Sequence, residues 1–574
     1  MRRRAKIVCT LGPASDTTAA IRELIEAGMS VARFNASHGS PEHRATVIDR
    51  VRAAADQIGE PVATILDVPG PEVRTAPLSE PVDLEAGERR RLVEGDTVDD
   101  QTLGVSTAVS AVDPGDTVLF DDGRIETTVT AVAGETVTVR IDSGGSLGGR
   151  QGVNVPGVDL GLDMVSEADR TELEMAVRHD VEYVAASFVG SAEDVYAVDG
   201  VLDELGADIP VIAKIERAKA VDNLEEILEA ADGVMVARGD LGVECPLEQI
   251  PLIQKRIIRE AQRAGSPVIT ATEMLDSMVE ARRPTRAESS DVANAILDGT
   301  GAVMLSGETA IGAHPTRVVE TMDRIVRSIE ASDRYAESRD NRVLSAGDIR
   351  TDAIARSARY LARDVDAEAI VAVTESGYTA QRVSKYRPTV PVVAVTPDRQ
   401  TRRRLALRWG VLPRYQSPPD GEISTLIDQS ATAAIDANVI NSGDTIVVLA
   451  GMMTDLEGGD TTNMMKVHLA AEILATGRGV RSGQAEGSVF LTTDGELADC
   501  PDDAIVSVPA EFDGEFRGDL SKITGLVSTN RGTTSYPAVV ARELGVPMVG
   551  GIEQTLPTDG TVAIDGERGV VYRE

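Results

Sequence analysis

The chain has 574 residues, more than one hydrophobic core can hold, because single cores stop growing at about 250–300 residues. Asp and Glu number 93 against 57 Lys and Arg, which gives a net charge of -36 and an isoelectric point near 4.6. Such a charge repels nucleic acid and anionic membranes, so we expect neither as a partner.

Lysine is scarce in this chain. The seven lysines are Lys6, Lys214, Lys219, Lys255, Lys385, Lys466 and Lys522. Together with the excess of carboxylates and an aromatic content of 3%, this scarcity is typical of halophilic proteins, in which high net charge maintains solubility. Three scattered cysteines suit neither a disulfide framework nor a zinc site, and no apolar run has the length of a membrane span. We therefore expect a cytoplasmic protein.

Short apolar runs alternate with amphipathic helical patterns through the first 330 residues, as in βαβ units around a parallel sheet. The helix in "TTAAIRELIEAGM" should start after Asp16 or Thr17 and stop at Gly28, and the helix in "IPLIQKRIIREAQRAG" should run from near Pro251 to Gly265. The expected strands are Lys6–Leu11, Ser30–Phe34, Val62–Asp67, Glu182–Phe188, Val211–Ile215, Gly233–Ala237, Pro267–Ala271 and Gly301–Leu305. Eight strands with crossover helices predict an α/β fold, a closed (β/α)8 TIM barrel.

Changes in composition divide the chain. Residues 1–69 and 156–335 should form the barrel, while residues 70–155, rich in Thr, Val and turn signals, should form a small inserted β-barrel domain, or lid. After a polar break at "SDRYAESRDNR", residues 345–475 alternate again, with strands in "IVAVTES", "PVVAVTP" and "DTIVVLAG", which predicts a three-layer α/β domain. "GRGVRSGQAEG" has the composition of a linker into a last domain, residues 485–574.

Polar side chains stand at the ends of the expected barrel strands, where an active site should lie. They are Arg33 and Asn35 after the second strand, Asp67 after the third, Lys214 and Glu216 after the fifth, Arg238 and Asp240 after the sixth, Thr272 after the seventh, and Ser306 and Glu308 after the eighth. Taken alone, Lys214 and Glu216 fit an internal ion pair that braces the barrel as well as they fit a catalytic site. The other polar residues at neighbouring strand ends favour a catalytic site.

The residue types at this site indicate phosphoryl or enolate chemistry. Glu216 and Asp240 offer hard oxygen ligands of the kind that Mg²⁺ prefers. Lys214 could neutralise a transferring phosphoryl group or a developing enolate. A helix beginning after "ARGDLG" would add backbone N–H donors for an anion.

Long motifs in this order resemble those of the pyruvate kinase family: "KIVCTLGPAS", "VARFNASHG", "LDVPGPEVRT", "GVNVPGVDL", "AKIERAKAVDNLEEIL", "DGVMVARGDLGVE", "ATEMLDSM", "RRPTRAESSDVANAILDGTGAVMLSGETA" and "TTNMMKVH". The resemblance runs from residue 5 to about residue 475. It implies a homotetramer that transfers the phosphoryl group of phosphoenolpyruvate to ADP in glycolysis. It also implies a barrel, a lid and a regulatory α/β domain.

The resemblance implies a role for each matching residue. Lys214 would stabilise the transition state and the enolate, and Glu216 with Asp240 would hold Mg²⁺ or Mn²⁺. Arg33 would bind the substrate's phosphate. The substrate's carboxylate would contact Thr272 and the Ala237–Gly239 backbone, with Ala237, Gly239 and Asp240 counted among the substrate-binding residues. Thr272, or water reached through it, is also a candidate for the proton path to the enolate carbon.

The nucleotide and a monovalent cation have implied sites as well. The nucleotide would contact Arg33, Asn35, His38 and Arg74. Potassium would be bound by Asn35, Ser37, Asp67 and the backbone carbonyl of Val68. Glu72 stands where a carboxylate accompanies potassium dependence in the family, because it leaves negative charge that K⁺ can balance.

Two positions depart from the family pattern: Pro69 and Gln151 replace expected lysines. The change at Gln151 puts one nucleotide-phosphate contact in doubt, and Arg150 is the candidate to replace it. "TESGYT", with Thr374, Ser376, Gly377 and Thr379, resembles a loop that binds the phosphate of an effector; an ordinary capped turn is the alternative.

The last domain resembles the swivelling phosphohistidine domain of phosphoenolpyruvate-utilising enzymes, through "TGLVSTNRGTTSYPAVVARELGVPMVGG". Tyr536 stands where that family has histidine. A phenol with a pKa near 10 is a poor phosphoryl carrier at neutral pH. We therefore interpret this domain as structural or as a stabiliser of the oligomer.

Two other functions fit parts of the sequence. A carbon–carbon lyase or aldolase acting on a pyruvate enolate would use the same barrel site without any need for a nucleotide or for Arg74. A catalytically silent metabolite sensor would use the "TESGYT" loop, but it predicts a broken active site, whereas all the residues named above are present. Fold alone does not distinguish these functions.

Overall fold

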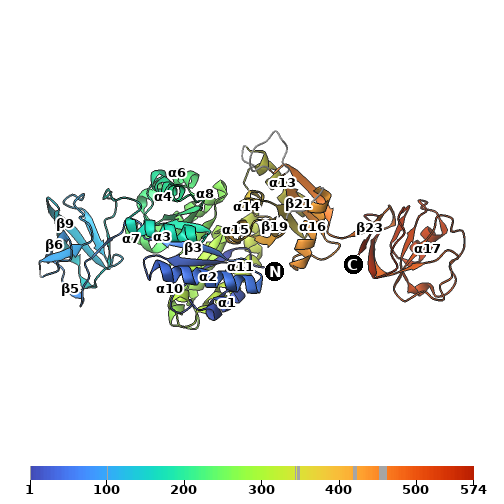
Figure 1. The fold of residues 1–574 in the computed structure, drawn as a ribbon, viewed down its shortest axis with the longest axis horizontal. Helices are drawn as coiled ribbons and strands as arrows, with labels where there is room; N and C mark the ends of the chain where they lie inside the picture. Colours follow the sequence, from blue (N-terminus) through green and yellow to red (C-terminus); the bar gives the residue numbers. More distant parts are fainter. Residues whose placement is uncertain (1, 100, 343, 346–348, 418–422, 452–461) are drawn as a thin grey trace. The chain divides into compact units, whose positions relative to one another are not determined.

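The computed structural model describes residues 2–99, 101–342, 344–345, 349–417, 423–451 and 462–574 (Figure 1). The chain divides into two compact units. The first consists of residues 1–347, 375–387 and 398–413, and the second of residues 348–374, 388–397 and 414–574. None of the described helices is both long and apolar enough to cross a membrane.

Eight parallel strands close into a barrel in the order β1-β17-β16-β15-β14-β13-β3-β2. Their bounds are β1 Lys6–Thr10, β2 Val31–Asn35, β3 Ala63–Val68, β13 Tyr183–Ala186, β14 Val211–Ile215, β15 Gly233–Ala237, β16 Val268–Ala271 and β17 Ala302–Leu305. Every expected strand is present, with ends within two residues of the prediction. The predicted barrel is confirmed.

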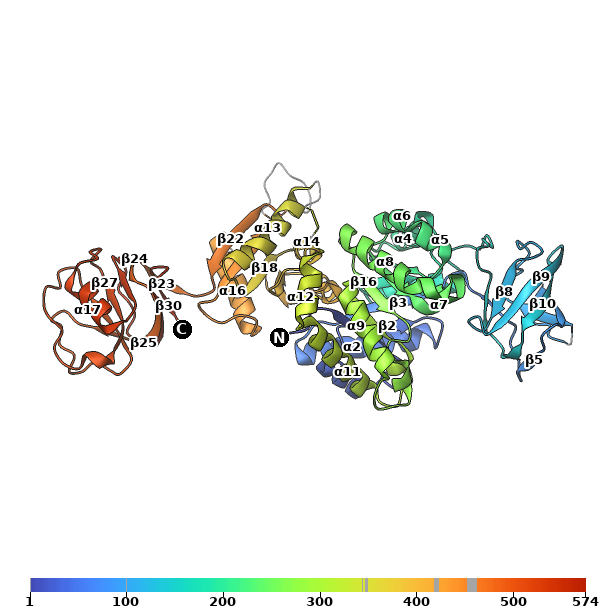
Figure 2. The ribbon, with the colours of Figure 1, turned by 180° about the vertical axis from the view of Figure 1, so that it is seen from behind.

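Helices cover the outside of this barrel, as both views show (Figures 1 and 2). They are α1 Thr18–Ala27, α2 Pro41–Ile58, α3 Glu167–Arg178, α4 Ala192–Glu204, α5 Ala218–Asp222, α6 Leu224–Ala230, α7 Arg238–Glu244, α8 Ile250–Ala264, α9 Arg286–Asp298, α10 Gly307–Ala310, α11 Pro315–Glu330 and α12 Asp333–Asp340. The Thr17 side chain caps α1, and α8 ends at Gly265 in the left-handed conformation, as predicted. The polar stretch "SDRYAESRDNR", predicted as a break before the next α/β stretch, forms helix α12 and buries Tyr335.

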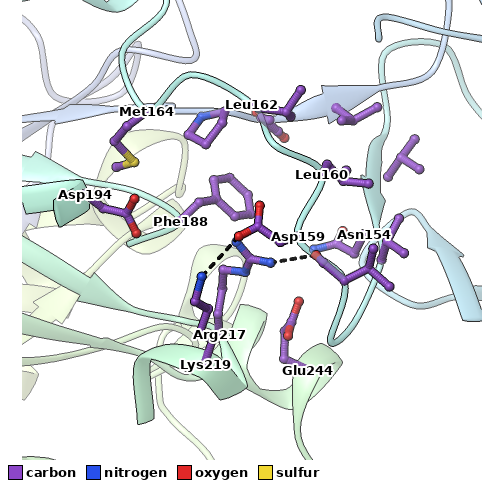
Figure 3. Close-up of a pocket in the computed structure, with 16 residues that line it drawn as sticks. Asn154, Asp159, Leu160, Leu162, Met164, Phe188, Asp194, Arg217, Lys219 and Glu244 are labelled. Atoms are coloured by element: carbon purple, nitrogen blue, oxygen red, sulfur yellow. Dashed lines mark hydrogen bonds and ion pairs between the residues drawn. The ribbon is translucent and has the colours of Figure 1, made fainter. Parts of the chain in front are cut away.

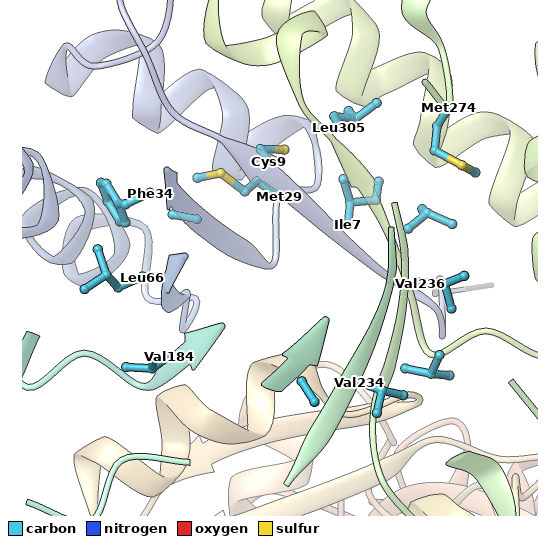
Figure 4. Close-up of a cluster of buried hydrophobic side chains, with 14 of the residues drawn as sticks. Ile7, Cys9, Met29, Phe34, Leu66, Val184, Val234, Val236, Met274 and Leu305 are labelled. Carbon is cyan, nitrogen blue, oxygen red and sulfur yellow. The ribbon is translucent and has the colours of Figure 1, made fainter. Parts of the chain in front are cut away.

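The barrel strands are apolar on both faces, because alternate side chains face the helices and the barrel interior. Ile7 and Cys9 of β1 pack in the cluster between strands and helices, which Figure 4 shows, while Val8 packs in the interior cluster. The interior cluster also contains Ala406 and Leu407. Residues distant in sequence therefore complete the barrel core.

The segment that supplies these two residues is attached at the amino-terminal ends of the strands. Helix α15 Arg399–Arg404 is followed there by a 3₁₀ turn, Leu405–Leu407. The Tyr183 hydroxyl donates to the Arg404 carbonyl at 2.8 Å, and the Arg403 guanidinium donates to the fully buried carboxylate of Glu182. The backbone N–H and the hydroxyl of Thr64 also donate to this carboxylate, at 2.8 and 2.6 Å.

The lid is all β in the described residues between 70 and 155, as predicted. Its main sheet has the order β4-β12-β8-β9-β10-β6-β7, and β11 pairs with β5. The strands are β4 Val73–Arg74, β5 Val82–Leu84, β6 Arg89–Glu94, β7 Thr102–Val105, β8 Thr117–Phe120, β9 Ile125–Ala133, β10 Thr136–Ser143, β11 Gly145–Leu147 and β12 Gly152–Asn154. One apolar cluster, with Phe120, Val129 and Val139 among its members, forms its core.

The next sheet has the order β20-β19-β18-β21-β22, with β22 antiparallel to β21. Its elements are α13 Arg350–Asp364, β18 Ala369–Val373, α14 Tyr378–Lys385, β19 Val392–Thr396, β20 Val411–Tyr415, α16 Ile423–Asp436, β21 Thr445–Ala450 and β22 Met464–Leu469. The three strands expected here correspond to β18, β19 and β21. The predicted α/β domain is confirmed.

The last sheet has eight strands in the order β23-β30-β29-β25-β26-β27-β28-β24. Its elements are β23 Ile473–Thr476, β24 Arg478–Arg481, β25 Gln484–Leu491, β26 Ala504–Val508, β27 Ile523–Ser528, α17 Tyr536–Leu544, β28 Met548–Gly550, β29 Thr561–Asp565 and β30 Val570–Arg573. The expected linker at "GRGVRSGQAEG" is therefore wrong. It forms edge strand β24 and the start of β25, and β24 is fixed by long-range pairing with β28. Because an edge strand buries little, its local sequence lacks the usual alternation.

We predict that Arg403→Ala destabilises the barrel by about 2 kcal/mol, because the fully buried Glu182 carboxylate loses its closest cation. Arg52, at 3.7 Å, would compensate only in part. The measurement is urea unfolding of the full chain. Arg22→Ala, which removes an exposed i,i+4 pair with Glu26, serves as the control and should change stability by less than about 0.5 kcal/mol. Equal effects of the two substitutions would contradict the proposed importance of Glu182.

Candidate active site

Four side chains form a charged network at the carboxyl ends of strands β2, β3 and β14 of the barrel. Arg33, at the end of β2, donates to the Asp67 carboxylate of β3 at 2.7 Å. Lys214 of β14 lies 3.4 Å from the other Asp67 oxygen and 3.3 Å from Glu216 Oε2. The Asp67 carboxylate thus lies between two cations that sequence analysis assigned to different roles.

Two residues of this network were missed by sequence analysis. The Ser187 hydroxyl accepts from Lys214 Nζ at 2.6 Å and donates to the Val68 carbonyl at 2.8 Å. The Thr10 hydroxyl accepts from Arg33 at 3.0 Å. Thr10 ends the first barrel strand and Ser187 directly follows β13, so the strand-end rule that selected the other residues would have found both.

The two carboxylate oxygens of Glu216 have different neighbours, since Oε2 is the one that lies 3.3 Å from Lys214. The backbone N–H of Phe188 donates to Oε1, whereas Oε2 is buried and has no hydrogen-bond partner among the described residues. Asp240, in the first turn of α7, lies close enough to influence the Glu216 pKa. No group of three or more His, Cys, Asp or Glu side chains with metal-binding geometry occurs in the described ranges. The two carboxylates of Glu216 and Asp240 suit Mg²⁺, which takes its other ligands from substrate and water.

The pKa values at the site show how strongly these charges interact. Burial raises the pKa of Glu216 to about 7, although Lys214 opposes that shift. Burial also works against the charge of Lys214, but Asp67 and Glu216 outweigh it and raise the Lys214 pKa above its usual value. Burial would likewise raise the pKa of Asp67, yet Arg33 and Lys214 hold it below its usual range. The lysine therefore stays protonated at neutral pH.

Thr272, directly after β16, has a backbone φ of 74°, a strained conformation for a β-branched residue. Arg238 holds it there, donating to the Thr272 carbonyl at 2.7 Å and to the Ala271 carbonyl at 3.0 Å. Asp291 accepts from the same guanidinium at 2.7 Å. Arg238 thus stabilises the backbone conformation of Thr272.

Two other expectations at the strand ends need correction. Helix α7 begins at Arg238 itself and not after "ARGDLG", so its free N–H groups lie next to Asp240. The Glu308 carboxylate accepts from the backbone N–H groups of Leu275 and Ser306, at 3.1 and 2.6 Å, and so braces two loops.

A cavity of about 550 Å³ opens beside Arg33. Asn35 and His38, both expected to meet the nucleotide, line it together with Arg33. Its other lining residues, missed by sequence analysis, include Pro13, His43 and Ile311. Their only sequence signal is proximity to the strand ends.

Arg74, the fourth expected nucleotide contact, does not line this cavity but lies on lid strand β4. Its guanidinium pairs with Glu72 at 2.7 Å and donates to the Arg150 carbonyl at 2.9 Å. The backbone of Gln151 pairs with Thr75. Gln151, where a lysine was expected, and Arg150, the candidate to replace that contact, therefore lie on the same lid edge as Arg74. The lid thus presents Arg74 and Arg150 as neighbouring cations.

The residues expected to bind K⁺ are brought together only in part. Asn35 Oδ1 accepts from the backbone N–H of Ser37 at 3.1 Å, and the Val68 carbonyl accepts from Ser187. Asp67 connects them to the charged network. Ser37 is exposed.

A second cavity, of about 90 Å³, lies where the chain leaves the lid for the barrel (Figure 3). Arg217 donates to the Val158 carbonyl at 3.0 Å, and Lys219 pairs with Asp159 at 3.1 Å. Phe188, whose N–H holds Glu216, also lines this cavity. The connection is therefore fixed to the segment that carries Glu216.

The remaining expected sites lie outside this cluster. Gly377, in the "TESGYT" loop, has φ 88° and immediately precedes α14. In the terminal domain, Tyr536 packs against Phe512 and Phe516, and its hydroxyl accepts from the Phe516 N–H at 3.2 Å. Tyr536, at the position where the resemblance leads us to expect histidine, is thus part of an aromatic cluster.

A closed (β/α)8 barrel with a buried lysine–carboxylate cluster at its carboxyl end, next to a large cavity, defines a barrel enzyme acting on an anionic substrate. The family model "Pyruvate kinase, barrel domain" matches residues 2–319, and "Pyruvate kinase, alpha/beta domain" matches residues 352–468. The chain belongs to the pyruvate kinase family. A third model, "PEP-utilising enzyme, mobile domain", matches residues 501–569.

Curated relatives are similar over their whole length. A pyruvate kinase of Geobacillus stearothermophilus is 42% identical over 589 aligned positions, covering 100% of this chain and 99% of the relative. Pyruvate kinases of Sporosarcina psychrophila and of a Staphylococcus aureus strain are each 40% identical, with 99% of both chains covered.

We predict that Gly239→Ala lowers kcat about 10- to 100-fold in a pyruvate kinase assay. An added Cβ would lie 2.8 Å from Thr272 Cγ2, and this stiff side chain would have to rotate and carry its hydroxyl away. Gly200→Ala on α4 is the matched control, because nothing lies within 4 Å of its added Cβ. A G239A enzyme with normal kcat, or equal losses in both variants, would contradict the assigned importance of this contact.

Proposed function

We propose that this chain transfers the phosphoryl group of phosphoenolpyruvate to ADP, producing pyruvate and ATP in glycolysis. The observation that carries the proposal is the network of Arg33, Asp67, Lys214 and Glu216, which has two cations and two carboxylates, with Arg33 lining a nucleotide-sized cavity. The family's reaction requires this arrangement of an anionic substrate next to a nucleotide.

In the proposed reaction, the bond from phosphorus to the enol oxygen breaks and a bond to the ADP β-phosphate oxygen forms. Arg33 binds the substrate phosphate. Lys214, kept protonated by its carboxylate neighbours, offsets charge on the phosphoryl group and on the enolate. Pyruvate forms when the enolate carbon takes a proton, for which Thr272 is the candidate path.

The remaining ligands are positioned by backbone and carboxylates. The Ala237–Gly239 backbone, with Asp240 and Thr272, orients the substrate's carboxylate. Glu216 and Asp240 would hold Mg²⁺ or Mn²⁺, which when bound supplies positive charge to the phosphoryl oxygens. Asn35, His38 and Arg74 would contact the nucleotide, with Arg74 arriving on the lid.

Several finer features are also part of the proposal. A homotetramer and a phosphorylated effector bound at Thr374, Ser376, Gly377 and Thr379 rest on the resemblance, whereas a cytoplasmic location and a salt-adapted surface rest on the composition. The start of α14 directly after Gly377 supports an anion at the effector loop, because a helix N-terminus carries a partial positive charge. The aromatic cluster around Tyr536 supports a structural role for the terminal domain.

We expect Lys214→Met to lower turnover at least 10²–10³-fold, because one preorganised charge is lost from the transition state. The measurement is pyruvate formation with and without ADP in molar KCl. Lys255→Met, which removes an exposed lysine paired with Asp298, should leave turnover unchanged. Pyruvate release that is equal without ADP would reject the kinase and favour the lyase.

We also expect activation by K⁺ through Asn35, Ser37, Asp67 and the Val68 carbonyl. Replacing K⁺ by tetramethylammonium at constant ionic strength should abolish most activity. Glu72→Lys should restore part of it by supplying a cation in place of a carboxylate, whereas Glu72→Gln, which also loses the pair with Arg74, should remain dependent on K⁺. Full activity of the unmodified enzyme without K⁺ would contradict the site.

A further inference from the structure

The turn between β2 and α2 carries His38, which lines the cavity of about 550 Å³ and is an expected nucleotide contact. The start of this β2–α2 turn is anchored by the Ala36 N–H, which donates to the Asp67 carbonyl at 2.9 Å. Its end is anchored by Ser40, which caps α2. Residues 37–39 between these anchors are exposed, so the position of His38 depends on hydrogen bonds and not on packing in the core.

Arg44 supplies a hydrogen bond to the middle of the β2–α2 turn. It lies one turn into α2, and its Nη1 donates to the His38 carbonyl. It also lies next to Gly39, since a Cβ added to that glycine would be 3.7 Å from Nη1. Only 5% of Arg44 is exposed, although it lines the cavity together with His38. The hydrogen bond therefore joins the exposed turn to a buried side chain.

Glu172 fixes the orientation of Arg44. Its carboxylate, on α3, accepts from Arg44 Nε at 3.1 Å and from Nη2, so the pair is bidentate. Glu172 is buried as well, and α3 is fixed at its start by a capping box of Ser166 and Asp169. With Nε and Nη2 directed at the carboxylate, the planar guanidinium leaves Nη1 for the His38 carbonyl.

Charge keeps Arg44 and Glu172 together. Burial raises the pKa of Glu172, and the hydrogen bonds and positive charge of Arg44 oppose that shift. The negative charge of this buried carboxylate therefore depends on Arg44. Removing either partner would leave the other as an uncompensated buried charge, which is strongly unfavourable.

A buried arginine with a similar set of bonds occurs away from the cavity. Arg3, which precedes β1, pairs with Asp323 at 2.9 Å. It also donates to the carbonyls of Ala5, at 2.7 Å, and of Gly28. Such a set of bonds can thus serve the fold alone. Arg44 differs from Arg3 because it lines the cavity and because the carbonyl it holds belongs to an expected nucleotide contact.

We propose that Arg44 is a positioning residue for nucleotide binding. Oriented by Glu172, it holds the His38 carbonyl and thereby sets the shape of the cavity for a nucleoside diphosphate. This inference rests on the proposed function, which makes a nucleotide the occupant of the cavity. Arg44 takes no part in the bond changes of the reaction. Its replacement therefore affects the affinity for the nucleotide and not the affinity for phosphoenolpyruvate.

The first test is Arg44→Lys, assayed by pyruvate formation with ADP and phosphoenolpyruvate varied in turn. A lysine lacks the planar fork, so it can pair with Glu172 but cannot also hold the His38 carbonyl in this geometry. We expect KM for ADP to rise about 3- to 10-fold, the effect of one lost hydrogen bond, while KM for phosphoenolpyruvate and kcat change less than about twofold. An unchanged KM for ADP, or an equal rise of both KM values, would overturn the proposal.

Arg3→Lys is the matched control, because it changes a buried arginine with the same kinds of bonds away from the cavity. Urea unfolding of both variants gives the loss of stability against which the KM values are compared. R3K should keep the KM for ADP of the unmodified chain. If this KM rose in R3K as it does in R44K, general destabilisation would be the cause and the positioning role would be rejected.

The second test measures ADP binding directly, by isothermal titration calorimetry with Mg²⁺ and without phosphoenolpyruvate. It needs no turnover, so an unmodified chain without kinase activity would contradict the proposed function alone. We expect Arg44→Lys and Glu172→Gln each to raise the Kd for ADP about 3- to 10-fold, since an amide no longer accepts from both Nε and Nη2. Two variants keep the test valid if one of them does not fold. Equal Kd values in the unmodified chain and in a folded variant would overturn the proposal.

Discussion

The rest of the active site depends on the attraction between Lys214 and the two carboxylates of Asp67 and Glu216. A single buried ammonium would be costly, and a pair of buried carboxylates would repel each other. Together with Arg33 they form a cluster in which each charge has a neighbour of opposite sign. The strands hold Lys214 Nζ 3.3–3.4 Å from the Asp67 and Glu216 carboxylates, so its positive charge is already in place before a substrate binds.

The barrel core makes such a cluster possible. Its strands are apolar on both faces, so charged residues can lie only where each strand ends. At these ends the backbone takes unusual conformations, with φ of 74° at Thr272 and 60° at Phe188. Arg238 and the Glu216 carboxylate stabilise these conformations by hydrogen bonds, and so the strain is located where substrate atoms must approach closely.

Most of this arrangement could be predicted from sequence. The eight strands were found because their apolar runs, their flanking Gly and Pro residues and their spacing agree, and Lys214, Glu216, Asp67 and Arg33 followed from the strand-end rule. The same rule would have found Thr10 and Ser187 if it had been applied to every strand. The rule does not predict where a side chain points. Arg238 and Glu308 stand at strand ends, but their side chains bond to the backbone of loops.

Long-range strand pairing was the second feature that could not be predicted from the sequence. Strand β24 lies in a Gly-rich stretch with the composition of a linker, and only its partner β28 makes it a strand. The helix α12 was also missed, since its polar face dominates the sequence while Tyr335 alone is buried. Elements that bury a single residue carry too little periodicity to be recognised.

The segment of residues 398–413 has a consequence for how the chain is made. Ala406 and Leu407 pack in the barrel interior at the amino-terminal ends of the strands, and Arg403 offsets the negative charge of the buried Glu182. The barrel's own strands are complete by residue 305, yet about a hundred further residues must leave the ribosome before its core can close. At a synthesis rate of about 5–20 residues per second, the barrel would remain open at its base for several seconds. The order of elements along the chain therefore makes barrel formation a late, cooperative event shared with the domain that follows it.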